Sequence, residues 1–505
     1  MQHNYFFKVI RILNRNKYIY RVYKIFIFRM YYWCLLFIVC VLLYYSVGDK
    51  YKGCILFASS IIFIAAFSLG VAVFSLLFTI LNYFFGILIE KFSDSQTLKN
   101  KLFWLSMFID VGILAFFKYL NSLFESINSI FFSSGIYSTI SLHSIMVPIG
   151  ISYYTFQALG YLIRIDRGSE KAEHNFFNFA TFLLFFPKFL SGPVERSNHF
   201  LPQLKNPGKF DKNNIELGVG LFLWGLFKKI VIADNLYFAV SKVYGDANHF
   251  TGVPLLIVLI VQTIYIYCDF SGYTDMALGM AKIFGINLID NFNRPFLARN
   301  ISEFWRRWHI SLSSWCNDFI YNPFIIKFRR WGNNAVIIGI FLTFFIVGIW
   351  HGANWTFVIL GLLQGVAIVY EFYTKRYRLK YASRLPKSVA NTLSRIIVFL
   401  FMAFSMIFFF ANSVADALHF IALLFSNLHF NRSEIDFIKN KPEFLTALFC
   451  FVILFIFEIF NEKGKNLLSI YLKQPVWVRS LGYLTCLVLS WLFYSGIHSF
   501  YYMRF

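Results

Sequence analysis

Long apolar runs separated by short polar segments form the main pattern of this chain. A helix needs about 20 mostly apolar residues to cross the hydrocarbon core of a bilayer, and the runs predict about eleven to thirteen membrane helices. The tract 53–90 is long enough for two of them, with Gly70 near its middle. The predicted spans are 31–47, two within 53–90, 102–120, 145–165, 176–192, 215–235, 253–284, 335–350, 353–373, 392–412, 443–460 and 480–500.

Several of these runs are short or are interrupted by proline or glycine. Pro148, Pro187 and Pro193 lie inside or beside apolar runs, where a proline breaks or tilts a helix. Irregular backbone at membrane depth is tolerated only where it packs in protein or lines a cavity. The pattern therefore predicts an all-α polytopic integral membrane protein. Interfacial or re-entrant helices should surround a central cavity, and residues 31–505 should form a single transmembrane domain.

The composition supports a membrane protein and argues against a nucleic-acid partner. Of the 505 residues, 58% are hydrophobic and 14% are charged, against about 25% charged in a soluble domain. The formal net charge is +22, but the basic residues lie between apolar runs, so orientation in the membrane and attraction to anionic membrane lipids explain it better. The seven cysteines have no metal-site spacing. We therefore expect neither a disulfide framework nor a bound metal.

Basic segments predict which parts face the cytoplasm. Residues 1–30 hold seven lysines and arginines and no acid, with apolar residues at near-helical spacing. This pattern is typical of a basic amphipathic helix on the cytoplasmic surface, or of an ordinary positive flank that orients the first span. The loop 375–395 is as densely basic, and we expect it to be cytoplasmic as well.

A polar segment, residues 293–321, interrupts the apolar pattern with the sequence NRPFLARNISEFWRRWHISLSSWCNDFIY. Asn300 and Glu303 have the spacing of a capping box, which predicts the start of a helix at Asn300. Glu303 and Arg307 would then pair one turn apart. The same helix would carry His309. The segment is either a snorkelling interfacial helix or part of a functional site, and residue types alone leave the two interpretations equally open.

A second histidine, His351, follows an apolar run in FFIVGIWHGANW, residues 344–355. A lone histidine beside such a run is often a packed residue. Here, however, Gly348 and Gly352 flank it and allow close approach of a ligand, and Trp350 adds a flat wall. Imidazole has an ordinary pKa of about 6.5, which suits proton transfer near neutral pH.

Two carboxylates, Asp269 and Asp275, lie in the apolar run 253–284. Charged groups inside a membrane usually pair with one another, so we expect a structural pairing, together with Glu303, rather than catalysis. The expected partners are Arg294, Arg299, Arg306 or Arg307. The chain lacks the motifs GxxxxGK[ST], HExxH and GxSxG, so nothing in it predicts a nucleotide-driven pump, a metalloprotease or a serine hydrolase.

Several long motifs carry a resemblance to a known family. They occur in one order between about Met146 and Gln364. Together they resemble the membrane-bound O-acyltransferase (MBOAT) family, and within it the branch typified by the alginate O-acetyltransferase membrane protein. The motifs are VPIGISYYTFQALGYLIRIDRG, FFPKFLSGPVERSNHFLPQL, FLWGLFKKIVIADNL, YCDFSGYTDMALGMAKIFGINLIDNFNRPF, RPFLARNISEFWRRWHISLSSWCNDFIYNPF and GIWHGANWTFVILGLLQG.

The resemblance implies the MBOAT fold and an acyl transfer from a thioester to a hydroxyl. It places the catalytic histidine of the family at His351, in its WHG context, and a second histidine of the branch at His309, in RRWHIS. It also implies that the donor is acetyl-CoA, a substrate rather than a bound cofactor. The branch supplies acetyl groups to extracellular polysaccharide across the bacterial cell membrane, with a separate extracytoplasmic acetyltransferase as partner.

Candidate donor- and substrate-binding residues surround the two histidines. Arginine recognises phosphate through paired hydrogen bonds, so the nearby cations are candidates for holding the phosphates of the donor. The candidates are Arg306, Arg307, Lys327, Arg329 and Arg330, with Trp305, Trp350 and Asn354 completing the set. Two alternatives remain: D-alanyl transfer to teichoic acid within the same family, and a non-enzymatic transporter of polysaccharide or lipid.

Overall fold

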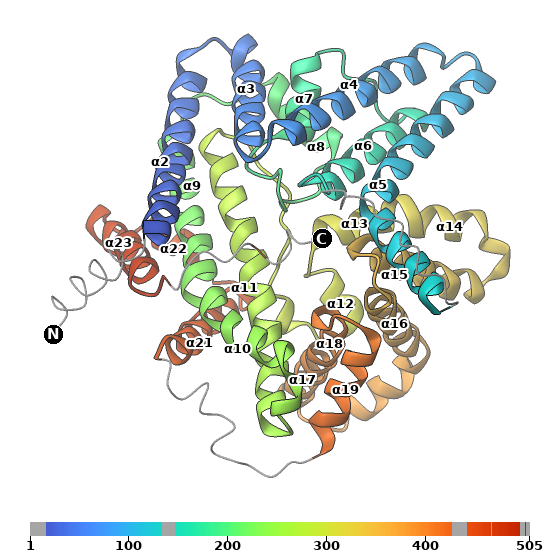
Figure 1. Cartoon of the computed structure of the whole chain (residues 1–505), viewed down its shortest axis with the longest axis vertical. Coiled ribbons are helices and arrows are strands. Elements are labelled where there is room, and N and C mark those ends of the chain that lie inside the picture. The colour runs from blue at the N-terminus through green and yellow to red at the C-terminus, as the bar shows by residue number, and fades with distance from the viewer. Residues whose placement is uncertain (1–16, 134–146, 427–441, 466, 495–499, 501–505) are drawn as a thin grey trace.

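The computed structural model describes residues 17–133, 147–426, 442–465, 467–494 and 500 of the chain. In this described part every regular element is a helix, and the only β-type contact is an isolated bridge between Phe292 and Trp308. The predicted all-α fold class is confirmed. Figure 1 shows an amino-terminal group of long helices beside a larger bundle.

Four long helices form the amino-terminal group. The tract 53–90 divides into two helices as predicted, and the break lies at Ser68. Ser68 has an extended backbone, and its hydroxyl accepts a hydrogen bond from the Val71 N–H at 3.4 Å, which is the role of a helix N-cap. The helices are α2 (Lys17–Ser46), α3 (Asp49–Phe67), α4 (Leu69–Lys91) and α5 (Gln96–Ser133).

Three short helices follow, and they replace two of the predicted spans. The run 145–165 forms only the 16-residue α6, and the run 176–192 forms only the nine-residue α7. Almost every side chain of α6 is buried, so its apolar residues face protein rather than lipid. Because α6 and α7 are mostly buried in protein, their sequences are as apolar as those of membrane-spanning helices. The helices are α6 (Ile151–Asp166), α7 (Phe176–Leu184) and α8 (Ser197–Lys205).

The central helix α11 (Val253–Ile283) packs along most of its length on α9 (Lys212–Phe227). Two pairs of glycines allow the close approach. A Cβ atom at Gly225 would lie 2.4 Å from the Gly272 carbonyl oxygen, and one at Gly279 would lie 2.4 Å from that of Gly218. A π-helical turn, η1 (Lys228–Ala233), joins α9 to α10 (Asp234–Gly245).

The remaining elements surround the two motif segments of the sequence. They are η3 (Pro295–Leu297), α12 (Ile301–Trp305), α13 (Ile310–Cys316), η4 (Asn317–Tyr321), α14 (Asn322–Lys327), η5 (Arg329–Trp331), α15 (Asn333–His351), α16 (Trp355–Ala382), α17 (Lys387–Ser405), α18 (Ile407–Phe410), α19 (Val414–Ser426), α21 (Pro442–Glu462), α22 (Leu467–Leu472) and α23 (Val476–Leu492). A short turn, η2 (Ala247–His249), precedes α11.

The described residues hold eight helices that are long and apolar enough to cross a membrane. Three shorter apolar helices, Tyr32–Ser46, Val414–Ser426 and Val476–Leu492, accompany them. The apolar runs therefore yield fewer helices of spanning length than the eleven to thirteen predicted. The protein is a multi-pass integral membrane protein.

Contacts between distant segments define one basic face of the protein. They connect the ends of α2, α4, α6, α8 and α11 and the start of α5. They continue to residues 297–307, which contact α16, α17 and α21. The contacts are Glu90 with His174, Lys99 with Asp166, Lys205 with Glu173, Gln203 with Asn287, Tyr45 with Ile283, Arg307 with Glu462, Arg395 with Leu297 and Glu371 with Ile301. We call this the basic face; it includes the loop 375–395.

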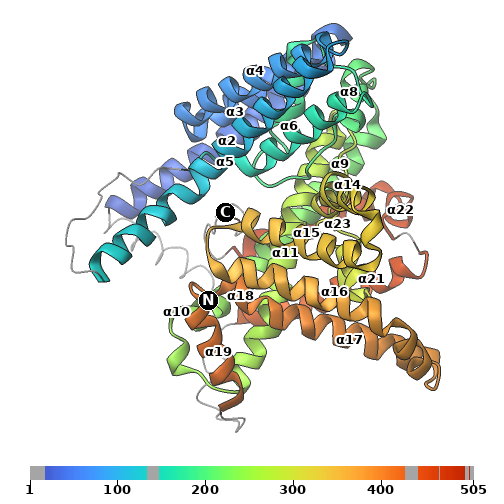
Figure 2. The same ribbon diagram turned by 90° about the vertical axis from the view of Figure 1, so that its right-hand side faces the viewer.

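The direction of α2 bears on the predicted orientation. The Tyr45 hydroxyl donates a hydrogen bond to the Ile283 carbonyl at 2.7 Å, so the Ser46 end of α2 lies at the basic face. The Lys17 end therefore points towards the opposite face, whereas the sequence analysis expected the amino-terminal segment and the loop 375–395 on one side. The loop 375–395 joins the end of α16 to the start of α17, and Figure 2 shows these two helices meeting at the lower right. Residues 1–16 of the predicted amphipathic segment lie outside the described residues.

Candidate active site

His309 lies in a kink between two short helices rather than within one. The Asn293 N–H donates to the Arg307 carbonyl at 2.9 Å, and the Ile310 N–H donates to the Asn291 carbonyl at 3.0 Å. These bonds hold His309 at φ 45° and ψ 51°, a left-handed conformation that costs a non-glycine residue about 1–3 kcal/mol. The continuous helix predicted from Asn300 onward is wrong, because this pairing interrupts it. The predicted N-cap is confirmed, since the Asn300 side chain accepts from the Glu303 N–H at 2.8 Å.

Asn291 fixes the tautomer of His309. The Asn291 Oδ1 atom accepts from the Ser311 hydroxyl at 2.5 Å and from the Ser311 N–H at 3.3 Å. A backbone N–H can only donate, so this atom is the amide oxygen. It lies 3.3 Å from Nδ1 of His309, which must then carry the proton and leaves the Nε2 lone pair as acceptor. Burial lowers the pKa of His309 to about 3, which favours this neutral form.

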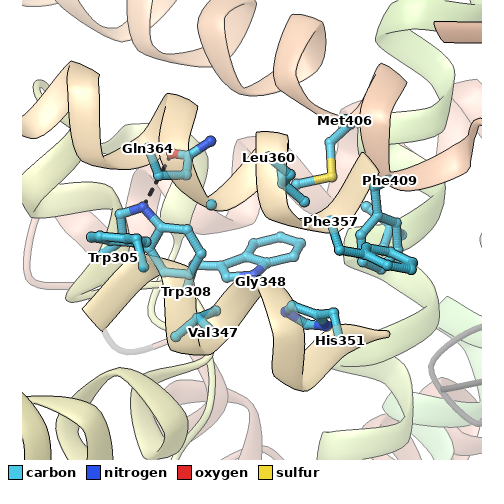
Figure 3. A pocket seen from close by; sticks show the side chains of 13 residues that line it. Trp305, Trp308, Val347, Gly348, His351, Phe357, Leu360, Gln364, Met406 and Phe409 are labelled. Carbon is cyan, nitrogen blue, oxygen red and sulfur yellow. Dashed lines mark hydrogen bonds between the residues drawn. The ribbon is translucent and has the colours of Figure 1, made fainter. Parts of the chain in front are cut away.

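His351 is the last residue of α15 and borders an apolar slot (Figure 3). Its ring centroid lies 5.6 Å from that of Phe409 and 6.2 Å from that of Phe357. The slot is lined by Ile266, Trp305, Trp308, Phe344, Val347, Gly348, His351, Phe357, Leu360, Gly361, Gln364, Met406 and Phe409.

Trp350 joins the two histidines. Its ring centroid lies 6.2 Å from that of His309 and 4.9 Å from that of His351. Tyr153 and Phe156 of α6 pack on the same indole at 5.7 Å and 5.4 Å. The tertiary structure thus brings the two predicted site histidines together at one tryptophan.

Two side chains of α5 close the end of α15. Lys118 donates a hydrogen bond to the Trp350 carbonyl, and the Tyr119 hydroxyl donates to the Ile349 carbonyl. The last carbonyls of a helix have no partner within it, so these bonds satisfy two of them beside His351. The Lys118 ammonium also lies 5.2 Å from the centroid of the Trp350 ring. Lys118 was not among the predicted site residues, although a single lysine inside the apolar run 102–120 is a signal of a functional contact.

Arg307 is held by two carboxylates. Its guanidinium lies 2.8 Å from Glu303 and 2.8 Å from Glu462 of α21, so the predicted Glu303–Arg307 pair is confirmed. Burial alone would raise the pKa of Glu303, but the Arg299 N–H and the Arg307 charge outweigh it and lower that pKa. These contacts make Arg307 a link between α12 and α21, whereas the neighbouring Arg306 is exposed.

The other predicted binding residues are divided between the site and its surroundings. Trp305 lines the slot and donates its indole N–H to Gln364 at 3.2 Å. Asn354 caps α16 by accepting from the Thr356 N–H, and it also donates to the Asn412 carbonyl, so both ends of its amide are used structurally. Lys327, Arg329 and Arg330 are exposed on the turn between α14 and α15.

The two buried aspartates pair with lysines, not with the arginines that the sequence analysis expected. Lys229 bridges Asp234 at 2.8 Å and Asp269 at 2.7 Å, and Lys228 contacts Asp275 at 2.7 Å. Both lysines lie on the π-helical turn η1, which directs two consecutive side chains towards α11. The predicted structural pairing forms, but the partner residues were wrong. Within the described residues no cluster of side chains could hold a metal ion.

The fold and the site define a multi-pass membrane protein with two buried histidines at one indole. The family described as "MBOAT, membrane-bound O-acyltransferase family" matches residues 136–414. The chain belongs to this family, and its activity is O-acyl transfer. Family membership favours this activity over the transporter alternative.

Named relatives agree on the activity but differ in substrate. The "Probable alginate O-acetylase AlgI" of Pseudomonas aeruginosa is 34% identical, over 78% of this chain and 74% of the relative. The "Peptidoglycan O-acetyltransferase" of Helicobacter pylori is 33% identical, over 67% of each chain. The "Teichoic acid D-alanyltransferase" of Bacillus subtilis is 30% identical, over 53% of this chain and 69% of the relative.

Proposed function

We propose that this protein takes an acetyl group from a cytoplasmic thioester, acetyl-CoA, and passes it across the bacterial cytoplasmic membrane for O-acetylation of an extracellular polysaccharide. The observation that carries the proposal is the contact of both His351 and His309 with Trp350, together with the position of His351 in an apolar slot. Such a slot suits the acyl portion of a donor, and the buried imidazole of His351 in its wall suits proton transfer.

His351 acts as general base in this proposal. It removes the proton of the acceptor hydroxyl as the oxygen attacks the thioester carbonyl carbon. The carbon–sulfur bond breaks as the ester forms, and the leaving thiolate takes up the proton from the imidazolium. His309 orients the acceptor or donor through its Nε2 atom, because its Nδ1 proton is directed at Asn291. Arg306, with Lys327, Arg329 and Arg330, attracts the negatively charged donor at the basic face.

A separate extracytoplasmic acetyltransferase receives the acyl group and completes its transfer to the polysaccharide. The relatives in Pseudomonas aeruginosa and Helicobacter pylori, both named for O-acetylation, support an acetyl group. The relative in Bacillus subtilis supports a second candidate, D-alanyl transfer to teichoic acid. It is less similar and covers less of this chain, so we favour acetylation.

Mass spectrometry of cell-surface polysaccharide tests the proposal. Cells that lack the protein should lose O-acetyl groups, and the wild-type gene should restore them, whereas the His351→Gln gene should not. D-alanyl loss in place of acetyl loss would select the second candidate. Unchanged acylation in cells without the protein would refute both.

A further inference from the structure

Three arginines lie close together outside the candidate active site, and two of them contact one phenylalanine ring. Arg164 and Arg167 lie at the end of α6, and Arg196 precedes α8. The guanidinium carbons of Arg196 and Arg167 lie 5.3 Å and 5.7 Å from the centroid of the Phe319 ring. We call these three residues the arginine cluster.

Arg196 is buried with incomplete hydrogen bonding. It is 7% exposed, and its Nη1 atom has no hydrogen-bond partner among the described residues. Its Nη2 atom donates to the Ser314 hydroxyl at 3.3 Å and to Asp318 at 3.4 Å, both longer than the 2.7–2.9 Å typical of a charge-assisted bond. A buried donor without a partner is costly. Such a group in a native protein indicates a ligand or ion that completes its bonding.

The charge around Arg196 favours an anion. Arg164 also has an unpartnered Nε atom within the described part of the chain. Two carboxylates oppose the three arginines. Asp318 is half-exposed, and Glu170, which interacts with Arg164, also accepts from the Ser197 hydroxyl at 2.6 Å. The three arginines and these two carboxylates together carry a net charge of +1. Arg167 is exposed, so an anion can reach the cluster from the side of Arg167 and Asp318.

The arginine cluster is connected to the histidines by packed aromatic rings. Phe319 contacts Trp315 at 5.0 Å, Trp315 stacks on Phe156 at 4.3 Å, and Phe156 contacts Trp350 at 5.4 Å. The loop before Arg196 is also fixed to the His309 turn, because the Val194 N–H donates to the Ser311 hydroxyl at 2.9 Å. The salt bridge of Asp166 with Lys99 places the end of α6 at the basic face. The cluster therefore lies where a donor from the cytoplasm would arrive.

We propose that Arg164, Arg167 and Arg196 form a phosphate-binding site for the pantetheine phosphate of the acyl donor. This inference rests on the proposed function. Guanidinium groups recognise phosphate oxygens through paired, charge-assisted bonds, and a phosphate at Arg196 supplies the missing partner of Nη1. The phosphate is the group that coenzyme A shares with the phosphopantetheine arm of a carrier protein. The cluster thus fixes one end of the donor, while its thioester end extends along the aromatic rings towards His351.

Donor analogues with and without the phosphate provide the test. The dissociation constants of acetyl-phosphopantetheine and acetyl-pantetheine are measured with the purified full-length protein in lipid vesicles. We expect the wild type to bind the phosphorylated analogue at least about tenfold more tightly, the effect of one charged hydrogen bond. Arg196→Met should lose this preference, and Arg196→Lys should keep part of it. Arg384→Met, which alters an exposed arginine in the loop 375–395, should leave the preference unchanged.

Two further measurements distinguish a loss of phosphate binding from misfolding of the variant and from failure of the proposed function. Arg167 is exposed, so Arg167→Met should fold normally and reduce the preference by a smaller factor. The affinities for acetyl-CoA and for acetyl-phosphopantetheine are also compared. If Arg196→Met weakens the binding of both by a similar factor, the phosphate that they share is the group recognised. A wild type without phosphate preference, or a preference that survives in Arg196→Met, overturns the inference alone. A wild type that binds neither acetyl-CoA nor acetyl-phosphopantetheine contradicts the proposed function as well.

Discussion

Lys118 in the middle of α5 donates a hydrogen bond to the main-chain carbonyl of Trp350, which lies 232 residues later in the sequence. The same ammonium lies 5.2 Å from the Trp350 ring. A cation inside a membrane helix costs about 2.5–3.5 kcal/mol, and here it is directed at the carbonyl end of the helix that carries His351. Lys118 therefore fixes the end of α15 at the candidate active site, from a helix that lies before the region matched by the family.

Replacing Lys118 should disturb this end of α15. Lys118→Met should lower kcat about tenfold or more with little change in KM for the donor, because the Trp350 carbonyl loses a partner worth about 1–3 kcal/mol. Lys118→Arg should restore part of the rate, since it keeps both the charge and a donor. Acyl transfer per folded protein measures the effect. Lys101→Met, an exposed lysine of the same helix, is the matched control, and a Lys118→Met variant as active as this control would contradict the assignment.

Replacing His351 tests the general base directly. His351→Gln should reduce acyl transfer by about 10²–10⁴-fold, which is typical of general base catalysis, while protein yield and thermal stability stay near the wild-type values. Glutamine keeps a hydrogen bond but cannot accept a proton near neutral pH. Reconstituted transfer assays with equal amounts of folded protein provide the measurement. His174→Gln, at an exposed histidine paired with Glu90, should remain active. If both variants lose activity only in proportion to yield, His351 is a packing residue.

Arg307 should matter for stability more than for donor binding. Arg307→Ala leaves Glu303 and Glu462 without their shared partner, and loss of a hydrogen bond to a charged group costs about 1–3 kcal/mol. We expect a clear drop in the thermal unfolding temperature. Arg299→Ala should change it little, because Arg299 is exposed and lies 3.6 Å from Glu303, where such pairs contribute about 0–1 kcal/mol. Equal unfolding temperatures for the two variants would show that Arg307 does not tie α12 to α21.

The lowered pKa of Glu303 predicts how this tie responds to acid. A carboxyl group with a folded-state pKa below its ordinary value of 4.5 stabilises the protein above pH 4.5, and this stability is lost as the pH falls through the lower pKa. Thermal unfolding of the wild type and of Glu303→Gln should therefore differ most at pH 7. The difference should shrink as the pH falls below about 4.5. A difference that is constant from pH 7 to pH 3.5 would exclude the ionised carboxylate as its cause.

The direction of α2 gives a topological prediction. In a cysteine-free background, Arg384→Cys should react with a membrane-impermeant maleimide only from the cytoplasmic side, as expected of the basic loop 375–395. Lys17→Cys, at the start of α2, should react from the opposite side. Asn248→Cys, in the turn between α10 and α11, should behave like Lys17→Cys. Labelling of Lys17→Cys and Arg384→Cys from one side would restore the original expectation of a cytoplasmic amino terminus.

The sequence by itself determined the features that depend on neighbouring residues. Apolar runs such as 53–90 predicted membrane helices, because each helix must satisfy its backbone internally and present apolar side chains to lipid. The N-cap at Asn300 and the Glu303–Arg307 pair followed from spacing within one turn. The motifs around His309 and His351 indicated the family, which the comparisons confirmed.

The tertiary structure decided the partners of charged groups and the lengths of buried helices. Lys228 and Lys229, rather than nearby arginines, pair with Asp275 and Asp269, because a π-helical turn directs them at α11. Buried α6 is as apolar as a lipid-facing helix, so hydropathy alone cannot separate the two. The left-handed backbone of His309 arises from pairing with residues 291–293. Such contacts join segments that are distant in the sequence, and no local pattern encodes them.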